Sequence, residues 1–284
     1  LGGVTPTVEG LYAMAPSFFD PFTKPDGSTL SFIEFISLIG WGLGYFGQPH
    51  ILVRFMAISS SRELKQATRI AMTWVAISLS AAVIVGLVGK VYLTVPLSGT
   101  DCETVFLVMT HMIFSPFAAG IILSAVLAAI MSTASAQLLV AASAFAQDFY
   151  HTLLQKDAGT KELVWVSRLS VLIIAAIAIG LGLNPQNLIL DIVAYAWAGF
   201  GAAFGPALLA SLFWRRTTRN GILAGIVTGG ITVLLWKQFS LWGLYEIIPG
   251  FFVASLAIFI VSTLDREPSP EITAIFDAVE KSDI

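Results

Sequence analysis

Seven apolar stretches run along this sequence, and each is long enough to cross a lipid bilayer. A crossing takes about 20 predominantly apolar residues. Backbone N–H and C=O groups need partners inside the bilayer, so segments of this kind form helices. The sequence therefore predicts an all-α integral membrane protein with seven transmembrane helices. These helices are expected at residues 31–55, 66–95, 116–150, 162–183, 188–213, 220–238 and 243–264.

The run at 104–114 is apolar but too short to span the bilayer. We expect a short interfacial helix there, divided from the third crossing by Ser115 and Pro116.

The composition argues against several other classes of protein. Hydrophobic residues make up 56% of the chain and charged residues 12%, whereas soluble domains carry about 25% charged residues. The net charge of −3 and the dispersed cations do not favour nucleic-acid binding. Cys102 is the only cysteine, and the three histidines, His50, His111 and His151, lie far apart without a metal-binding spacing. We expect no enzymatic activity and no cofactor.

Lysine and arginine residues indicate the orientation. If the N-terminus lies outside, twelve of the 15 Lys and Arg residues fall on the inner side, and only Lys24, Lys90 and Lys237 fall on the outer side. A cytoplasmic excess of this kind is typical of membrane proteins. Residues 1–30 are then an extracytoplasmic lead-in, and residues 265–284, rich in Asp and Glu, are a short soluble cytoplasmic tail.

The first apolar stretch is interrupted by GWGLGYFGQPH at residues 40–50. Such a Gly/Pro interruption survives at membrane depth only where the freed backbone groups face protein, water or a bound solute. Broken helices of this kind indicate a transporter's binding site. Trp41, Tyr45 and Pro49 recur every four residues, on one face if a helix persists, and could line an apolar pocket for a small substrate. Alternatively, the glycines only permit tight packing, although packing alone does not explain Gln48 and Pro49.

The third crossing contains SAVLAAIMSTASAQ at residues 124–137, which places small side chains on one helix face. One interpretation is a seam for close helix packing. The other is a Na⁺ site, because the carbonyl of Ala129 lies one turn below the hydroxyls of Ser132 and Thr133, and Na⁺ binds oxygens of these kinds. The spans carry almost no charged residues between their ends. Na⁺ coupling and a substrate of no net charge therefore suit this chain better than proton coupling.

Seven helices with an outer N-terminus also occur in receptors and retinal proteins. A retinal protein needs a lysine in its last helix, and residues 243–264 contain none. A rhodopsin-like receptor usually has an outer disulfide and an NPxxY motif in its seventh helix, but here Asn184 and Pro185 are expected in a loop. A seven-helix receptor or sensor module stays the alternative from a different class.

The chain resembles the sodium:solute symporter family, and within it the proline carriers. The likeness lies in GWGLGYFGQPHILVRFM, GIILSAVLAAIMSTASAQLLV, YAWAGFGAAFGP and VLLWKQFSLWGLYEIIPGF, at residues 40–56, 120–140, 195–206 and 233–251. The resemblance implies the inverted-repeat fold of the leucine transporter. Residues 31–213 then form the second five-helix repeat, and residues 214–264 form two additional C-terminal helices.

The resemblance also implies a function, the Na⁺-coupled import of L-proline by alternating access across a bacterial inner membrane. It associates Trp41, Tyr45 and Pro49 with the substrate, and Ala129, Ser132 and Thr133 with Na⁺. At Ala136, close relatives carry a cysteine, so the resemblance assigns no substrate role to that position. A symporter of another small solute, such as a different amino acid or a carboxylate, stays an alternative within the same fold.

The chain begins at Leu1 without an initiator methionine, and the family's other broken helix has no counterpart in it. We expect a fragment whose missing N-terminal half supplies the remaining substrate and ion ligands. Its expected partners are thus L-proline, Na⁺, the lipid bilayer and that N-terminal half, with no nucleic acid.

Overall fold

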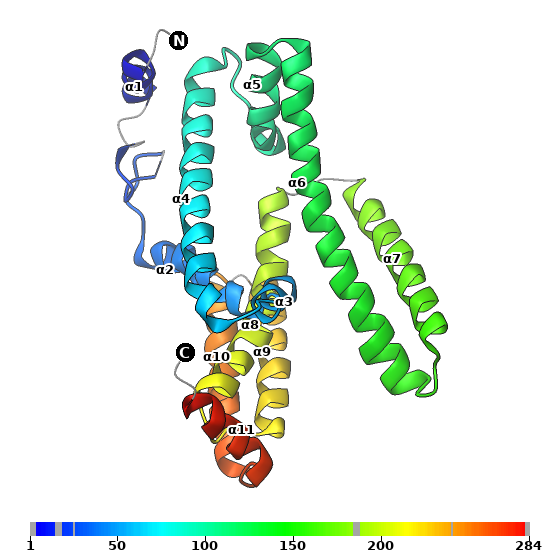
Figure 1. Cartoon of the computed structure of the whole chain (residues 1–284). Helices are drawn as coiled ribbons and strands as arrows, with labels where there is room; N and C mark the ends of the chain where they lie inside the picture. Colours follow the sequence, from blue (N-terminus) through cyan, green and yellow to red (C-terminus); the bar gives the residue numbers. More distant parts are fainter. Residues whose placement is uncertain (1–3, 15–18, 25, 184–187, 240, 282–284) are drawn as a thin grey trace. The chain divides into compact units, whose positions relative to one another are not determined.

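The computed structural model of the chain describes residues 4–14, 19–24, 26–183, 188–239 and 241–281 (Figure 1). Every regular element in these ranges is a helix, and six are long and apolar enough to cross a membrane. The prediction of an all-helical membrane protein is confirmed. The six are α4 (Ser61–Tyr92), α6 (Pro116–Ser143) with its continuation η4 (Ala144–Leu154), α7 (Thr160–Gly182), α8 (Ile189–Phe213), α9 (Arg219–Phe239) and α10 (Ile247–Leu264).

The first predicted crossing, 31–55, is not one continuous helix. The helix α2 (Phe32–Gly40) leads into η2 (Trp41–Gly47), which is a 3₁₀-helix. The backbone of Gln48 is extended (φ −83°, ψ 111°), and α3 (Pro49–Met56) begins directly after it. The predicted interruption is therefore confirmed. The apolar run α2–η2 is shorter than the six long helices, so the count of seven crossings stays a prediction.

Two other sequence expectations can be compared with the structure at this point. The short helix expected at 104–114 is confirmed as α5 (Val105–Ile113), its place at the membrane interface stays a prediction, and Ser115 is the N-cap of α6. The third crossing continues beyond 150 because the π-helix η4 prolongs α6 to Leu154. Asn184 and Pro185, expected in a loop, lie outside the described residues.

The structure contains helical segments that the apolar pattern did not predict. The helix α4 begins at Ser61, five residues before its predicted start, because Glu, Lys and Gln are good helix formers even where the chain is polar. The helices α1 (Val4–Met14) and α11 (Pro270–Lys281) lie within the predicted lead-in and tail.

The chain divides into two compact units, and each is described by itself. The α6 unit is Ser78–Ile189, and the α8 unit comprises Gly2–Ile77 and Leu190–Ile284. In the α6 unit, α7 packs along α6 and η4 (Figure 1). The Tyr150 hydroxyl of η4 donates a hydrogen bond of 2.6 Å to the Glu162 carboxylate of α7. This bond ties the π-helical end of α6 to the start of α7.

Glycines let α9 and α10 pack closely in the α8 unit. Gly221, Gly225 and Gly229 recur every four residues on α9 and are buried, as in the small-residue seams of membrane helices. A Cβ on Gly221 would overlap the Ser262 hydroxyl of α10, and one on Gly225 would overlap the Ile258 side chain. The two backbones are thus as close as glycine permits.

The helix α8 packs against this pair. Ala198 and Ala202 of α8 are fully buried and form the core of the unit with Val233 of α9 and Ile247 of α10. A Cβ on Gly229 would overlap the Ala202 carbonyl oxygen, so α9 also touches the backbone of α8. These three helices form the support on which the interrupted segment lies.

Candidate functional site

Glycines place η2 directly on α8. A 3₁₀-helix has three residues per turn, so Gly44 and Gly47 lie on the same face, and both are buried. A Cβ on Gly44 would overlap the indole nitrogen of Trp197, and one on Gly47 would overlap the Phe200 carbonyl oxygen. The tight-packing interpretation of the glycines is therefore supported at these two positions. The segment thus has both features, an interrupted helix and glycines that permit close packing.

Gln48 joins the interruption to α8. Its side chain is 4% exposed, and Nε2 donates a hydrogen bond of 3.2 Å to the Trp197 carbonyl oxygen. A buried polar group needs a partner of this kind. Pro49 occupies the first position of α3, where a missing N–H costs the helix no hydrogen bond. Gln48 and Pro49 therefore end η2 and restart the helix.

Four aromatic residues form a cluster on this support, the aromatic cluster of Trp41, Tyr45, Trp197 and Tyr245. The Trp41 and Trp197 rings stack with centroids 5.5 Å apart, and Tyr45 meets Trp197 edge-on at 4.9 Å. The Tyr245 ring stacks on the Trp41 ring, with the two centroids 6.4 Å apart. Tyr45 is 51% exposed, so the cluster presents an aromatic surface outside the core.

The four-residue spacing does not by itself place Trp41, Tyr45 and Pro49 on one face. That expectation holds for an α-helix, whereas residues four apart in a 3₁₀-helix are offset by about 120°. Trp197 instead brings Trp41 and Tyr45 together, since its ring contacts both. Pro49 lies on the other side of the Gln48 interruption, in α3.

Tyr245 connects the cluster to two helices of the α8 unit, α8 and α2. Its hydroxyl donates a hydrogen bond of 2.7 Å to the Ala194 carbonyl oxygen of α8, and its backbone N–H donates one of 3.0 Å to the Ser37 hydroxyl of α2. Burial, followed by the neighbouring Glu246 carboxylate, raises the pKa of the Tyr245 hydroxyl, so it remains a donor. Neither Trp197 nor Tyr245 was predicted from the sequence to lie at this site, and Tyr245 was expected at the outer membrane interface, although both residues lie in segments that carry the family likeness.

An ion pair between a buried carboxylate and a half-exposed lysine lies beside Tyr245. Glu246 is 6% exposed, and its Oε1 lies 3.5 Å from Nζ of Lys237 at the end of α9. The same ammonium group lies 5.9 Å from the centre of the Tyr195 ring of α8. Glu246 and Lys237 thus join α9 to the start of α10, next to the aromatic cluster.

The candidate Na⁺ ligands lie in the other unit, on α6. Ala129, Ser132 and Thr133 are exposed, and the Thr133 hydroxyl donates a hydrogen bond of 3.3 Å to the Ala129 carbonyl oxygen. These two oxygens are therefore as close as the sequence predicted. The hydroxyl keeps lone pairs that can face a cation.

The rest of the small-residue face of α6 is largely exposed as well. Ser124, Ala125, Ala128 and Ser135 are all exposed, and Ala136 is partly buried. Most of the face is therefore uncovered within the described part of the α6 unit. Both of its interpretations, a packing seam and an ion site, stay open.

The described residues form six long apolar helices and an interrupted apolar helix with an aromatic surface, a combination typical of multi-pass membrane transporters. The chain matches the model of the sodium:solute symporter family over residues 1–229, and it belongs to this family. The resemblance inferred from the sequence is thus confirmed.

Three relatives illustrate the similarity. The chain is 53% identical over 245 residues to the sodium/proline symporter of Escherichia coli (strain K12), covering 84% of this chain and 49% of the relative. It is 46% identical over 285 residues to the osmoregulated proline transporter OpuE of Bacillus subtilis (strain 168), covering 99% and 57%. It is 45% identical over 278 residues to the high-affinity proline transporter PutP of the same organism, covering 97% and 58%. The chain spans about half the length of the curated relatives it matches.

Proposed function

We propose that the chain is part of a Na⁺-coupled symporter that imports L-proline. The observation that carries this proposal is the aromatic cluster on the interrupted segment α2–η2–α3 in a member of the sodium:solute symporter family. The names of the relatives support proline as the substrate and Na⁺ as the coupling ion. Coupling to Na⁺ requires no covalent chemistry from the protein and no cofactor.

The substrate contacts follow from the chemistry of proline, which has an apolar ring and a zwitterionic head. Trp41 and Tyr45 supply aromatic surface for the ring, and Pro49 adds a further apolar side chain after the interruption. The backbone near Gln48 leaves the regular helical pattern. Its N–H and C=O groups are suited to the carboxylate and the ammonium group of the substrate.

Na⁺ is bound by Ala129, Ser132 and Thr133 in this proposal. Their carbonyl and hydroxyl groups offer three oxygens, whereas hard cations of this size take about six oxygen ligands. The remaining ligands come from the N-terminal repeat that the longer relatives have room for. Ala136 keeps the helix face small without adding a ligand.

The arrangement in the membrane follows the same resemblance. Residues 31–213 form the second inverted repeat of a leucine-transporter-type fold, in which α2–η2–α3 is one crossing. Residues 214–264 add two helices, for seven crossings in all. Residues 1–30 face outwards, and residues 265–284 face the cytoplasm, in a bacterial inner membrane.

Transport then proceeds by alternating access. Na⁺ binding stabilises the outward-open state and increases the affinity for proline. By linkage, proline must increase the affinity for Na⁺ by the same factor. One repeat moves against the other around the central site, so both repeats are required.

A chimaera tests this function. This chain replaces the matching region of the Escherichia coli sodium/proline symporter, in cells that lack their own proline carriers. We expect uptake of labelled proline with an inward Na⁺ gradient and almost none without it. Residues 1–284 produced alone should insert but not transport.

The alternatives give different results in the same assay. A symporter of another solute would show Na⁺-dependent uptake of a different amino acid or a carboxylate, with little competition by proline. A receptor or sensor module would show no uptake of any of these solutes. Either result would contradict the proposed function.

A further inference from the structure

The tail after the last long helix contains a helix with two different faces. In α11, Ile272, Ile275 and Val279 are 58%, 66% and 53% exposed. Their spacing of three and four residues puts them on one face. Acidic residues elsewhere on α11 give the tail its polar composition, and for that reason the sequence suggested a soluble end. The face itself is apolar.

The polar side of α11 is held by the loop between α8 and α9. Nε and Nη2 of Arg215 donate hydrogen bonds of 2.7 Å and 2.9 Å to the two carboxylate oxygens of Asp277. Asp277 follows Ile275 by two residues, and two residues turn an α-helix by about 200°. The two-point contact therefore holds the side of α11 that lies away from Ile275 and fixes the rotation of the helix.

The same loop between α8 and α9 also contacts α10 and the residues that follow it. Trp214 stacks on Phe259 of α10 with ring centroids 5.3 Å apart, and tryptophan is enriched at membrane interfaces. The Arg216 guanidinium donates hydrogen bonds of 2.8 Å and 3.2 Å to the carbonyl oxygens of Asp265 and Arg266, just after α10. The loop that holds α11 is thus also fastened to the end of α10.

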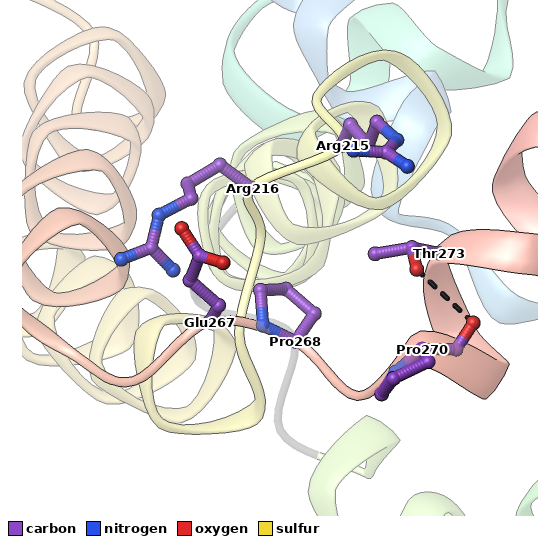
Figure 2. A pocket seen from close by; sticks show the side chains of 6 residues that line it. All are labelled: Arg215, Arg216, Glu267, Pro268, Pro270 and Thr273. Atoms are coloured by element: carbon purple, nitrogen blue, oxygen red, sulfur yellow. Dashed lines mark hydrogen bonds between the residues drawn. The ribbon is translucent and has the colours of Figure 1, made fainter.

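A cavity lies between this loop and the start of α11 (Figure 2). It measures about 300 Å³, and in Figure 2 the arginine side chains lie across from the first turn of α11. The side of α11 that faces this loop therefore carries Thr273 and Asp277. Its lining residues are Arg215, Arg216, Glu267, Pro268, Pro270 and Thr273.

The short linker keeps α11 close to the bilayer. Only residues 265–269 separate α10 from α11, and a chain of this length spans at most about 20 Å. Leu264, the last residue of α10, is 82% exposed, and Ile260 one turn earlier is 46% exposed. The helix α11 thus begins within a short reach of the end of a helix that is long and apolar enough to cross a membrane.

We propose that α11 lies on the surface of the bilayer, with Ile272, Ile275 and Val279 inserted among the lipid acyl chains. Arg215 holds Asp277 on the protein side and thereby turns the apolar face outwards. The occupant of this face is lipid, because the five-residue linker holds α11 at the end of a helix that is long and apolar enough to cross a membrane. The exposed side chains of Arg219 and Arg266 nearby also suit the phosphates of lipid headgroups.

Nitroxide accessibility tests the proposal independently of transport. The full chain, with Cys102→Ser, is reconstituted into vesicles of phosphatidylethanolamine and phosphatidylglycerol, and a spin label is attached at Ile275→Cys. The matched control is Ala274→Cys, an exposed position outside the apolar face. We expect oxygen to relax the label at 275 severalfold more than a water-soluble nickel chelate does, and the reverse at 274.

Two results would overturn the proposal. Preferential relaxation by the nickel chelate at both positions would place α11 in water. Shielding of position 275 from both reagents would mean that protein covers the face, either another segment or a second copy of the chain.

A charge exchange tests the part played by Arg215. In Asp277→Asn, the labels at positions 275 and 274 should differ less in their relative relaxation by oxygen and the nickel chelate, because α11 can rotate. The double variant Arg215→Asp, Asp277→Arg should restore this difference in relaxation. If the difference were unchanged in Asp277→Asn, the positioning role of Arg215 would be contradicted.

Discussion

The indole N–H of Trp197 donates a hydrogen bond of 2.9 Å to the Trp41 carbonyl oxygen, and the two indole rings stack 5.5 Å apart. These residues are 156 positions apart in the chain. One tryptophan thus holds a carbonyl of the interrupted helix, stacks on Trp41 and meets the edge of Tyr45. The position of both candidate substrate residues therefore depends on α8.

Replacing Trp197 should impair proline binding through these contacts. Trp197→Phe keeps an aromatic ring but loses the hydrogen bond, which contributes about 1 kcal/mol, or about fivefold in affinity. Trp197→Ala also loses both ring contacts and should have the larger effect. The measurement is the proline concentration for half-maximal uptake by the chimaera. If this concentration were the same in wild type and Trp197→Ala, Trp197 would not support the substrate site.

Glycine substitutions in η2 should lower the stability of the protein only at positions that pack closely against α8. Gly44→Ala and Gly47→Ala would each force a methyl group into α8, and overpacking of this kind costs about 1–3 kcal/mol. Gly42→Ala is the matched control, since no atom lies within 4 Å of the added methyl group. Thermal unfolding of the detergent-solubilised protein measures the difference. A similar loss of stability in all three variants would contradict the packing of η2 on α8.

The hydroxyls of α6 should control the response to Na⁺. Ser132→Ala and Thr133→Ala each remove one oxygen from the proposed ion site, which should cost about 1.4 kcal/mol or more, or at least about tenfold in apparent Na⁺ affinity. Ser124→Ala is the control, because Ser124 is also exposed on α6 and its hydroxyl donates to the Gly120 carbonyl oxygen. The Na⁺ activation curve of proline uptake is the measurement. Normal curves for both test variants would favour the packing seam.

Substitutions at the aromatic cluster should affect the substrate rather than the ion. Trp41→Ala and Tyr45→Ala remove apolar contact with the proline ring, so the half-saturating proline concentration should rise. The Na⁺ activation curve, measured at saturating proline, should change much less. If a double variant bound proline with unchanged affinity, these rings would lie outside the pocket.

Cys102 offers a test of orientation. Its thiol is exposed, and it lies in η3 (Gly99–Thr104), between α4 and α5. In the proposed orientation this segment is outside the cell, so a membrane-impermeant thiol reagent should label Cys102 in intact cells. If Cys102 were labelled only after permeabilisation, the orientation would be opposite to the one proposed.

The sequence predicted the interruption at Gln48 and Pro49 because the chemistry responsible is local. Proline lacks a donor and glycine lacks a side chain, whatever lies around them. The hydrogen bond between Thr133 and Ala129 was predictable for the same reason, since both groups belong to one helical turn.

The sequence could not predict the role of Trp197, because its contacts join segments that are far apart in the chain. The 3₁₀ winding of η2 was also missed, so the four-residue spacing of Trp41 and Tyr45 was assigned to one α-helical face. In α11, the acidic residues obscured the aliphatic spacing of Ile272 and Ile275. That spacing is local, because it depends only on the helical period.

The winding of η2 also changes how far the interrupted segment reaches. A 3₁₀-helix rises about 2.0 Å per residue and an α-helix about 1.5 Å. With nine residues in α2 and seven in η2, the segment from Phe32 to Gly47 is about 28 Å long, compared with about 24 Å if it were entirely α-helical. The hydrocarbon layer of a bilayer is about 30 Å thick. The segment from Phe32 to Gly47 has fewer residues than an α-helical crossing needs, but its length nearly matches the thickness of that layer.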